Sequence, residues 1–270
     1  INFLIFTLAK KINPNCRNIL FVHEPYRKEK RVFGFLGFFY FYLQEFFQSI
    51  SFKKVQSVIL PSPLAKKIFL SRYQWFRGNI YNVNLLLNDE PHVNLERKYF
   101  TFGGGLNKGK GLKEFIDLVN YTAIKKLDHK FKIITSNKIE KYLSNLSEDG
   151  RKMLIIENRK DITDFEMYKI HAESIAFFLL HKNATQSGAM PVSFMHGTPI
   201  IAKNMEAFSQ YIKHKTNSYL LPVNFETIDL FEAMKFVIKN NKKLSLNARK
   251  TYLEEFSDLN FKNMYDQIFK

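Results

Sequence analysis

Residues 184–199 combine small polar side chains with glycines, a composition suited to binding an anion. They follow an apolar run at 175–180 that is typical of a buried strand, and a second apolar run comes after them. Ser187 and Gly188 could open a short helix between the two strands, and Gly197 could close it. At the carboxyl end of a parallel strand, the free N–H groups of such a helix start favour a negatively charged ligand. An ordinary strand–helix–strand unit without a ligand is the alternative.

Five glycines within residues 103–111, interleaved with Lys108 and Lys110, form a second candidate site. The loop lies between a predicted strand and a predicted helix, so its backbone N–H groups could approach a phosphate while a lysine adds charge. Gly104 through Lys110 fits Gly-x4-Gly-Lys, but Gly111 stands where a P-loop needs Ser or Thr for magnesium. The dinucleotide fingerprint fails too, because Lys108 replaces its third glycine. The loop therefore favours a phosphate site of another kind over a purely structural turn.

Two histidines follow predicted strands at the end where parallel sheets place catalytic side chains. His23 comes after the strand at 18–22, and His181 comes after the strand at 175–180. A histidine in such a place can hold a substrate hydroxyl or exchange a proton with it. We expect His181 to line the same pocket as residues 184–199, whereas capping of a strand end is the alternative for His23.

The composition excludes several classes of protein. With 270 residues and 46% hydrophobic side chains, the chain is long enough for two domains with proper cores. Its one cysteine, Cys16, excludes a disulfide framework and fits a reducing compartment. Neither a His-Glu-x-x-His motif nor a cysteine pair occurs in the sequence, so we expect no metal centre. The net charge of +16 predicts an anionic partner, which could be a nucleic acid, a membrane face or a phosphorylated small molecule.

Apolar strand-like runs alternate with amphipathic helical segments along the chain, which predicts an α/β fold with doubly wound parallel sheets. The expected strands are 18–22, 55–60, 79–83, 99–102, 131–134, 153–156, 175–180, 200–202 and 219–222. The expected C-terminal helices are 225–239, 243–256 and 261–269. A polar, proline-bearing segment at 88–92 predicts the linker between two domains. We therefore expect domains at 1–92 and 93–255, with a final helix at 256–270 that returns to the first domain.

The segment 27–54 places basic residues beside an aromatic run, which is typical of an interfacial membrane anchor. The run from Val32 to Leu43 is shorter than the ~20 residues that cross a bilayer. A buried helix and a site for single-stranded nucleic acid are the alternatives. The chain opens with Ile1 and no secretory leader, so we expect a cytoplasmic protein, peripheral on the inner face of the membrane, whose N-terminal domain is truncated.

Residues 184–199 resemble the donor-sugar motif of family-four retaining glycosyltransferases (glycosyltransferase group 1), in the subgroup whose motif reads Ala-Thr-Gln-Ser-Gly. The loop 103–111 is similar to the family's segment of Gly-Arg-Leu followed by Lys-Gly, whose arginine and lysine bind the donor diphosphate. The lysine corresponds to Lys110. The arginine corresponds to Gly105, so one cationic group is missing and Lys108 would have to replace it.

A second departure concerns two glutamates that many family members use to hold the donor sugar and ribose. Those positions fall on Ala184 and Val192, and neither carries a carboxylate. The polar side chains at 185–187 would have to make the sugar contacts instead. The similarity covers about 95–225 well and about 18–90 loosely.

The resemblance implies the GT-B architecture, in which two Rossmann-like domains face a cleft. It also implies retaining, metal-independent transfer of a hexosyl or related sugar from a nucleoside-diphosphate donor to a hydroxyl of a polysaccharide or lipid-linked glycan precursor, with no cofactor. His23 and Lys110 are the expected catalytic residues. The expected donor-binding residues are Gly104, Gly105, Lys108, Lys110, His181, Thr185, Gln186, Ser187 and Gly188.

Two other functions remain open at this point. The missing arginine and glutamates favour a catalytically inactive, glycosyltransferase-like protein that binds a sugar or a membrane. Charge and aromatic content favour a nucleic-acid-binding protein, but no recognised nucleic-acid motif supports that interpretation. We therefore expect a nucleotide-sugar donor and a glycan or lipid-linked acceptor, together with an anionic membrane surface, and no nucleic acid.

Overall fold

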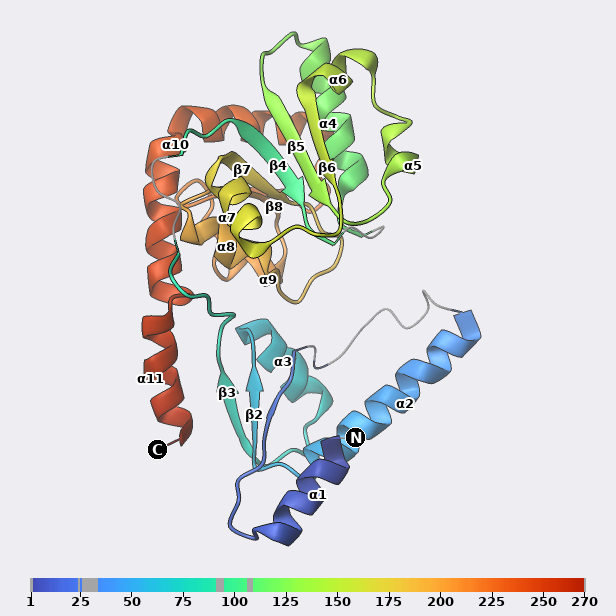
Figure 1. Cartoon of the computed structure of the whole chain (residues 1–270), viewed down its shortest axis with the longest axis vertical. Helices are drawn as coiled ribbons and strands as arrows, with labels where there is room; N and C mark the ends of the chain where they lie inside the picture. The colour runs from blue at the N-terminus through green and yellow to red at the C-terminus, as the bar shows by residue number, and fades with distance from the viewer. Residues whose placement is uncertain (1, 24, 26–33, 91–94, 106–108, 270) are drawn as a thin grey trace. The chain divides into compact units, whose positions relative to one another are not determined.

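The computed structural model describes residues 2–23, 25, 34–90, 95–105 and 109–269, and it divides into two compact units (Figure 1). The first unit holds residues 1–85 and 264–270, and the second holds residues 86–263. The division thus falls earlier than residue 92. The last residues of the chain group with the first unit from position 264 onward, whereas the sequence placed a returning helix at 256–270.

The first unit contains a small parallel sheet with the order β1-β2-β3. Its strands are β1 (Ile19–Phe21), β2 (Ser57–Leu60) and β3 (Asn79–Asn82). Its helices are α1 (Asn2–Ile12), α2 (Gly34–Phe52) and α3 (Pro63–Arg72). The start of α3 is fixed by the Ser62 hydroxyl, which accepts a hydrogen bond from the Ala65 N–H at 3.1 Å, and by a proline in the first turn.

Aromatic side chains form most of the core of the first unit. The ring of Phe52, at the end of α2, meets Phe69 of α3 at 5.0 Å and Tyr73 at 4.7 Å, both edge to face. Val58 and Leu60 of β2 are fully buried beneath these rings. The C-terminal end of α2 is therefore held firmly to the sheet.

The second unit contains a six-stranded sheet in which all neighbours are parallel, in the order β6-β5-β4-β7-β8-β9. The strands are β4 (Tyr99–Gly103), β5 (Lys130–Thr135), β6 (Leu154–Asn158), β7 (Ser174–Leu179), β8 (Ile200–Lys203) and β9 (Tyr219–Leu221). This is the strand order of a Rossmann sheet, and it confirms the doubly wound α/β fold that the sequence predicts. The chain winds outward in one direction from β4 and in the other from β7.

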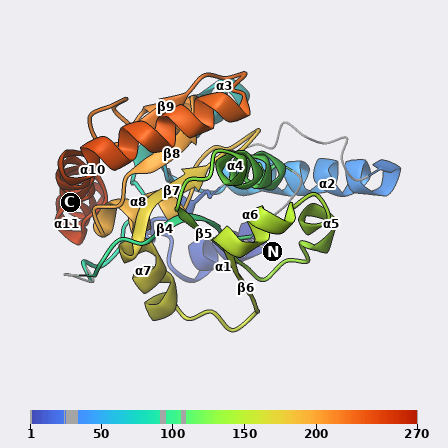
Figure 2. The ribbon, with the colours of Figure 1, turned by 90° about the horizontal axis from the view of Figure 1, so that it is seen from above.

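Helices cover both faces of this sheet. The helices of the second unit are α4 (Leu112–Ile124), α5 (Glu140–Leu143), α6 (Glu148–Met153), α7 (Asp164–Ala172), α8 (Ala189–Met195), α9 (Glu206–Ser209) and α10 (Thr227–Glu255). The last helix, α11 (Asp258–Phe269), is divided between the two units at residue 264. Seen from above, α7 and α10 lie on opposite sides of the strands (Figure 2). Leu112 and Phe115 of α4 share one buried core with Met234 of α10 and the side chains of β4 and β5.

The sequence-based break between 239 and 243 is wrong, because α10 runs without interruption through this segment. The segment contains polar residues but neither glycine nor proline, so nothing in it prevents helical hydrogen bonding. The amide of Asn240 donates back to the carbonyl of Phe236 at 2.9 Å, and that of Asn241 donates to the carbonyl of Ile175 at 3.0 Å. Both asparagines are thus satisfied inside the continuous helix.

Candidate functional site

The two stretches singled out in the sequence follow neighbouring strands of the second unit. The glycine loop follows β4, residues 180–188 follow β7, and these strands pair in parallel with Phe102 opposite Phe178. Their carboxyl ends meet where the winding of the sheet reverses (Figure 1). Ligands of doubly wound sheets bind in the crevice at such a reversal point.

The glycine loop needs its first two glycines for different structural reasons. A Cβ on Gly103 would lie 2.4 Å from the Ile134 side chain, so only glycine allows β4 and β5 to approach so closely there. Gly104 has a φ of 97°, and its N–H donates to the carbonyl of Ile134 at 3.0 Å. A Cβ on Gly105, by contrast, would meet no atom within 4 Å. The space beside Gly105 is therefore open, as a ligand site requires.

Direct contacts hold the two loops together. The N–H of Lys182 donates to the carbonyl of Gly109 at 2.6 Å. Gly111 adopts a φ of 86°, and a Cβ there would lie 2.4 Å from the Cβ of Leu180 and 2.6 Å from its carbonyl oxygen. Glycine at 111 thus lets the start of α4 pack against the end of β7, which brings Lys110 close to His181.

Lys110 supplies positive charge at this point. Its side chain is partly buried, and desolvation lowers its pKa from the ordinary value. Among the residues that the structure describes, no carboxylate lies within ion-pair distance of its ammonium group. A desolvated lysine without an acidic partner is well suited to receive an anionic ligand.

His181 lies beside Lys110 and is only 6% exposed. Burial, reinforced by the charge of Lys110, lowers its pKa to about 3, so the imidazole is neutral near pH 7. Its ring packs edge to face on Phe208 with centroids 5.4 Å apart. Its Nδ1 is buried and has no hydrogen-bond partner in the described part of the chain. Because an unmade buried hydrogen bond is costly, this nitrogen is a strong candidate for contact with a ligand.

Residues 185–188 continue from His181 into α8. Thr185 and Gln186 are partly buried, and Ser187 is buried. Gly188 is the residue that precedes α8, and a Cβ on it would meet no atom within 4 Å. The helix has only seven residues, so its dipole is small and the open backbone at Gly188 matters more than the helix itself.

Arg97, which precedes β4, fixes the far end of α8. Its guanidinium donates to the carbonyls of His196 and Gly197, both at 2.9 Å, and to the Thr198 hydroxyl at 2.8 Å. Burial lowers the pKa of Arg97 to about 10. Carbonyls at a helix C-terminus favour a cation, so Arg97 stabilises the turn after α8. A lone arginine before a strand gives no sequence signal for this role.

Two expected site residues are not among the described residues of the second unit. His23 is exposed and follows β1 in the first unit, whereas the other candidates belong to the second unit. Lys108 lies outside the described residues. Within the described ranges, no group of three or more His, Cys, Asp or Glu side chains could hold a metal ion.

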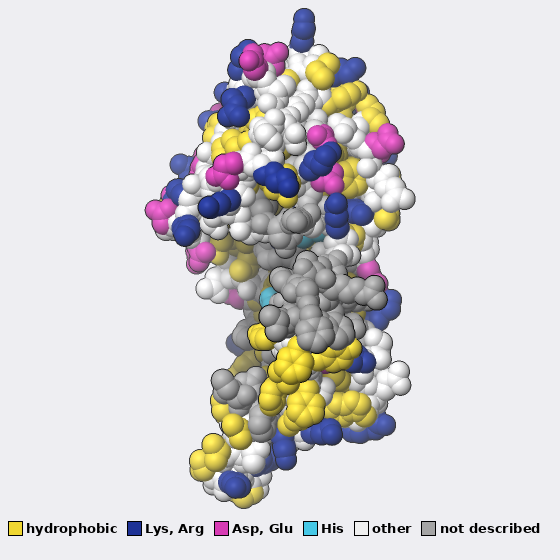
Figure 3. Space-filling model, turned by 90° about the vertical axis from the view of Figure 1, so that its right-hand side faces the viewer, with side chains coloured by type: hydrophobic (Ala, Val, Ile, Leu, Met, Phe, Trp, Pro, Cys, Tyr) yellow, Lys and Arg dark blue, Asp and Glu magenta, His cyan; other side chains and the backbone are white. Residues whose placement is uncertain are grey.

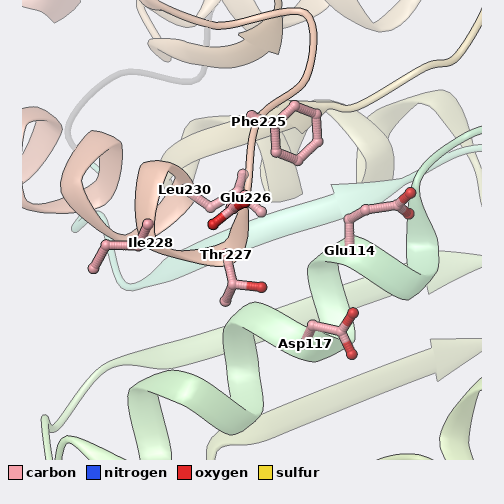
Figure 4. Close-up of a pocket in the computed structure, with 7 residues that line it drawn as sticks. All are labelled: Glu114, Asp117, Phe225, Glu226, Thr227, Ile228 and Leu230. Atoms are coloured by element: carbon pink, nitrogen blue, oxygen red, sulfur yellow. The ribbon is translucent and has the colours of Figure 1, made fainter.

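A pocket of about 430 Å³ lies between α4 and the start of α10, and none of its lining residues belongs to the glycine loop (Figure 4). Glu114 and Asp117 line it from α4, and Glu226 lines it from the segment that enters α10. Glu114 also lies 3.9 Å from the ammonium group of Lys182. Three carboxylates would repel a diphosphate, so this pocket and the Lys110 site favour ligands of opposite charge.

Comparison with known proteins gave structural matches only. No protein-family model and no curated protein sequence matches the chain. Staphylococcus aureus TarM, solved with fondaparinux, α-GlcNAc-glycerol and UDP, superimposes with a TM-score of 0.74 at 16% identity, over 98% of this chain and 53% of TarM. The pneumococcal O-GlcNAc transferase GtfA, solved with UDP and GlcNAc, gives 0.72 at 11% identity, over 99% of this chain and 53% of GtfA.

A third similar structure corresponds to part of the chain. The C-terminal domain of a glycosyl transferase group 1 family protein from Francisella tularensis matches with a TM-score of 0.54 at 16% identity, over 62% of this chain and 95% of that domain. The chain spans about half the length of TarM and GtfA. Two Rossmann-like units and these similarities lead to one conclusion about architecture: the chain has the fold of the GT-B glycosyltransferases.

Proposed function

We propose that the chain takes part in transferring a sugar from a nucleoside-diphosphate donor to a hydroxyl group of a glycan or lipid-linked glycan precursor. The observation that carries this proposal is the juxtaposition of Lys110 and His181 at the reversal point of the second sheet. One is a partly buried cation without an acidic partner in the described chain, and the other presents a buried ring nitrogen with no partner there. A diphosphate would satisfy both groups.

The proposed chemistry is electrostatic. When the bond between the sugar and the diphosphate breaks, negative charge grows on the departing diphosphate. Lys110 would stabilise this charge, together with backbone N–H groups of Gly104, Gly105, Ser187 and Gly188. Retention of the anomeric configuration and independence of metal ions belong to the proposal because the sequence resembles a retaining family. His23 is proposed to act on the acceptor side of the sugar, and Lys108 to add charge to the diphosphate site.

Binding without turnover is a second candidate function, supported by the side chains that are missing. Gly105 and Ala184 stand where the resembling family has an arginine and a glutamate, and neither can neutralise or orient the donor. A protein of this kind would bind nucleotide sugars but neither hydrolyse nor transfer them. Calorimetric titration with UDP-GlcNAc, combined with an assay for released UDP, separates the two candidates.

The role of Lys110 can be tested by binding. We expect Lys110→Ala to weaken the affinity for UDP at least about tenfold, since hydrogen bonds to charged groups contribute roughly 1.5–3 kcal/mol. Turnover with a nucleotide sugar should fall further, because the charge on the diphosphate is larger in the transition state. Calorimetry with UDP, GDP and ADP measures the affinity and identifies the nucleotide.

Lys152→Ala is the matched control, since this lysine is exposed and pairs with Asp149 within α6. It should leave the affinity and the melting temperature unchanged. An unaltered affinity for UDP in a folded Lys110→Ala protein would remove the basis of the proposed donor site.

The acceptor and its location complete the proposal. A cytoplasmic enzyme that acts on a lipid-linked precursor works at the inner face of a membrane, and an anionic surface there suits a chain with a net charge of +16. The sequence places the contact within 27–54, of which residues 27–33 lie outside the described residues.

A further inference from the structure

Helix α2 carries exposed apolar side chains on one face. Phe39, Leu43 and Phe46 recur at intervals of four and three, so they share one face, and all three are exposed. Glu45 and Phe52 lie on the packed side, where the carboxylate of Glu45 accepts a hydrogen bond from Arg72 at 2.6 Å. Helix α2 thus presents aromatic and aliphatic side chains to solvent on one face, and water solvates such a face poorly.

Helix α1 packs beside α2 and adds a second apolar stripe to the same unit. Leu4, Leu8 and Ile12 follow one another at intervals of four, and each is more than half exposed. Figure 3 shows hydrophobic side chains gathered on this face of the first unit, with Lys and Arg side chains along its border. Of the helices that the structure describes, none is long and apolar enough to cross a membrane.

The charge of the first unit is strongly positive. Residues 1–85 contain 13 Lys and Arg but only three Asp and Glu, so this third of the sequence carries most of the net charge. Lys10 and Lys11 lie in the last turn of α1, and Lys53 and Lys54 directly follow α2. The structure describes two acidic residues in this unit, Glu45, which pairs with Arg72, and Asp266 near the C-terminus. An apolar face bordered by lysines in a unit of strongly positive charge is complementary to an anionic bilayer.

We propose that α1 and α2 form an interfacial docking surface for an anionic phospholipid bilayer, with both helices lying in the plane of the headgroups. The docking itself is independent of catalysis, but its use, bringing the enzyme to a lipid-linked acceptor, rests on the proposed function. The 19 residues of α2 extend about 28 Å along the surface. The apolar face enters the boundary between headgroups and acyl chains, and the lysines contact the phosphates.

Charge and residue type favour a bilayer over other occupants of this face. A second copy of the chain would bring the same positive surface into contact with itself, and like charges oppose such a dimer. Tyr40, Tyr42 and Trp75 are exposed on this unit, and Tyr and Trp are the residues that accumulate at membrane interfaces. A nucleic acid would leave the leucine and isoleucine side chains of α1 in water.

Vesicle binding tests the proposal, and the fluorescence of Trp75 reports on it. Trp75 is the single tryptophan, is 42% exposed, and has the ammonium group of Lys53 5.9 Å from its ring centre. Vesicles of phosphatidylglycerol mixed with phosphatidylcholine should sediment the 270-residue chain and shift the Trp75 emission to shorter wavelength. Vesicles of phosphatidylcholine alone should do neither, and added salt should reverse much of the binding.

Two sets of variants separate the apolar contribution from the charged one. Phe39→Gln, Leu43→Gln and Phe46→Gln combined should weaken vesicle binding more than about tenfold, because the apolar face no longer enters the lipid. Lys11→Gln with Lys54→Gln should weaken it by roughly fivefold for each charge removed.

Matched controls come from exposed positions of the second unit. For the apolar set they are Ile124→Gln, Leu246→Gln and Leu259→Gln, and for the charged set they are Lys138→Gln with Lys242→Gln.

Each other outcome overturns the proposal. Unchanged vesicle binding in the folded apolar variant would exclude this face. Concentration-dependent self-association that the apolar variant abolishes would assign the face to a second copy, and oligonucleotide binding without vesicle binding would assign the lysines to nucleic acid. The proposed donor site is tested independently of the docking surface. The α2 variant should keep its affinity for UDP, and Lys110→Ala should keep its affinity for vesicles.

Discussion

At the scale of single residues, replacing His181 tests whether this histidine contacts a ligand or only packs in the core. Its Nδ1 has no hydrogen-bond partner within the described ranges, so the unliganded protein leaves a buried polar atom unsatisfied. We expect His181→Leu to raise the free energy of unfolding by about 1 kcal/mol while it weakens UDP binding. Chemical denaturation and calorimetry measure the two effects. If the variant loses stability and binds UDP normally, His181 belongs to the core alone.

The stability of the wild-type protein and that of His181→Leu should also depend differently on pH. The pKa of His181 is about 3 in the folded protein and about 6.5 when it is unfolded, so the unfolded state binds more protons below pH 6.5. Its contribution to stability is therefore complete above pH 6.5 and is lost as pH falls from 6.5 toward 3. Between pH 8 and pH 5, the wild-type chain should lose about 2 kcal/mol more than His181→Leu. His171 has the same lowered pKa and is present in both proteins, so it cancels from the difference.

The candidate site residues that could be predicted from the sequence are those that follow a recognisable strand. Lys110 and His181 follow strands that are recognisable as apolar runs, so their convergence follows from the parallel order of the sheet. Arg97 could not be found this way, because its partners are carbonyl groups about 100 residues further along the chain, around Gly197. Because every residue has a backbone carbonyl, the residue types do not show which carbonyls bind Arg97.

At the scale of the elements, the glycine loop offers a test with an internal control. Gly111→Ala would force a side chain into the left-handed region and against the buried backbone of Leu180, and we expect it to cost roughly 2–3 kcal/mol of stability. Gly105→Ala adds the same methyl group in open space and should cost less than about 0.5 kcal/mol. Urea denaturation of both variants measures the difference, and equal costs would contradict the close packing of α4 against β7.

Strands were easier to predict than helix boundaries in this chain. Buried strands such as 175–180 are continuous apolar runs, which a buried parallel sheet requires on both faces. The predicted break at 240–242 falls on polar residues, which do not interrupt a helix as glycine or proline would. Helix α1 gave no usable signal, because its apolar stripe faces outward and resembles a buried helix in sequence.

At the scale of the whole molecule, the division into units depends on contacts that the sequence does not reveal. The proline-bearing segment placed the linker at 88–92, but Leu87 and Asp89 are bound to the C-terminal helical region. The N–H of Leu87 donates to the carbonyl of Phe256 at 3.2 Å, and its carbonyl accepts from the Tyr252 hydroxyl at 2.8 Å. Arg249 donates to both oxygens of Asp89 at 2.6 Å. Residues 86–89 thus belong to the second unit, which is why the boundary lies at 85.

These contacts predict how the second unit behaves alone. A fragment of residues 86–263 should fold and bind UDP with the affinity of the whole chain, because the residues at 104–188 that we propose to bind the donor lie within it. A fragment of residues 95–263 lacks the partners of Arg249 and Tyr252, and it should be less stable by about 2–4 kcal/mol. Asp89→Asn in the longer fragment isolates the ion pair and should account for only part of this loss, since the bonds to Leu87 remain. Urea denaturation of the three proteins measures the differences, and equal stability of the two fragments would mean that residues 86–89 contribute nothing to the unit. Loss of UDP binding in a folded 86–263 fragment would instead show that the first unit supplies part of the donor site.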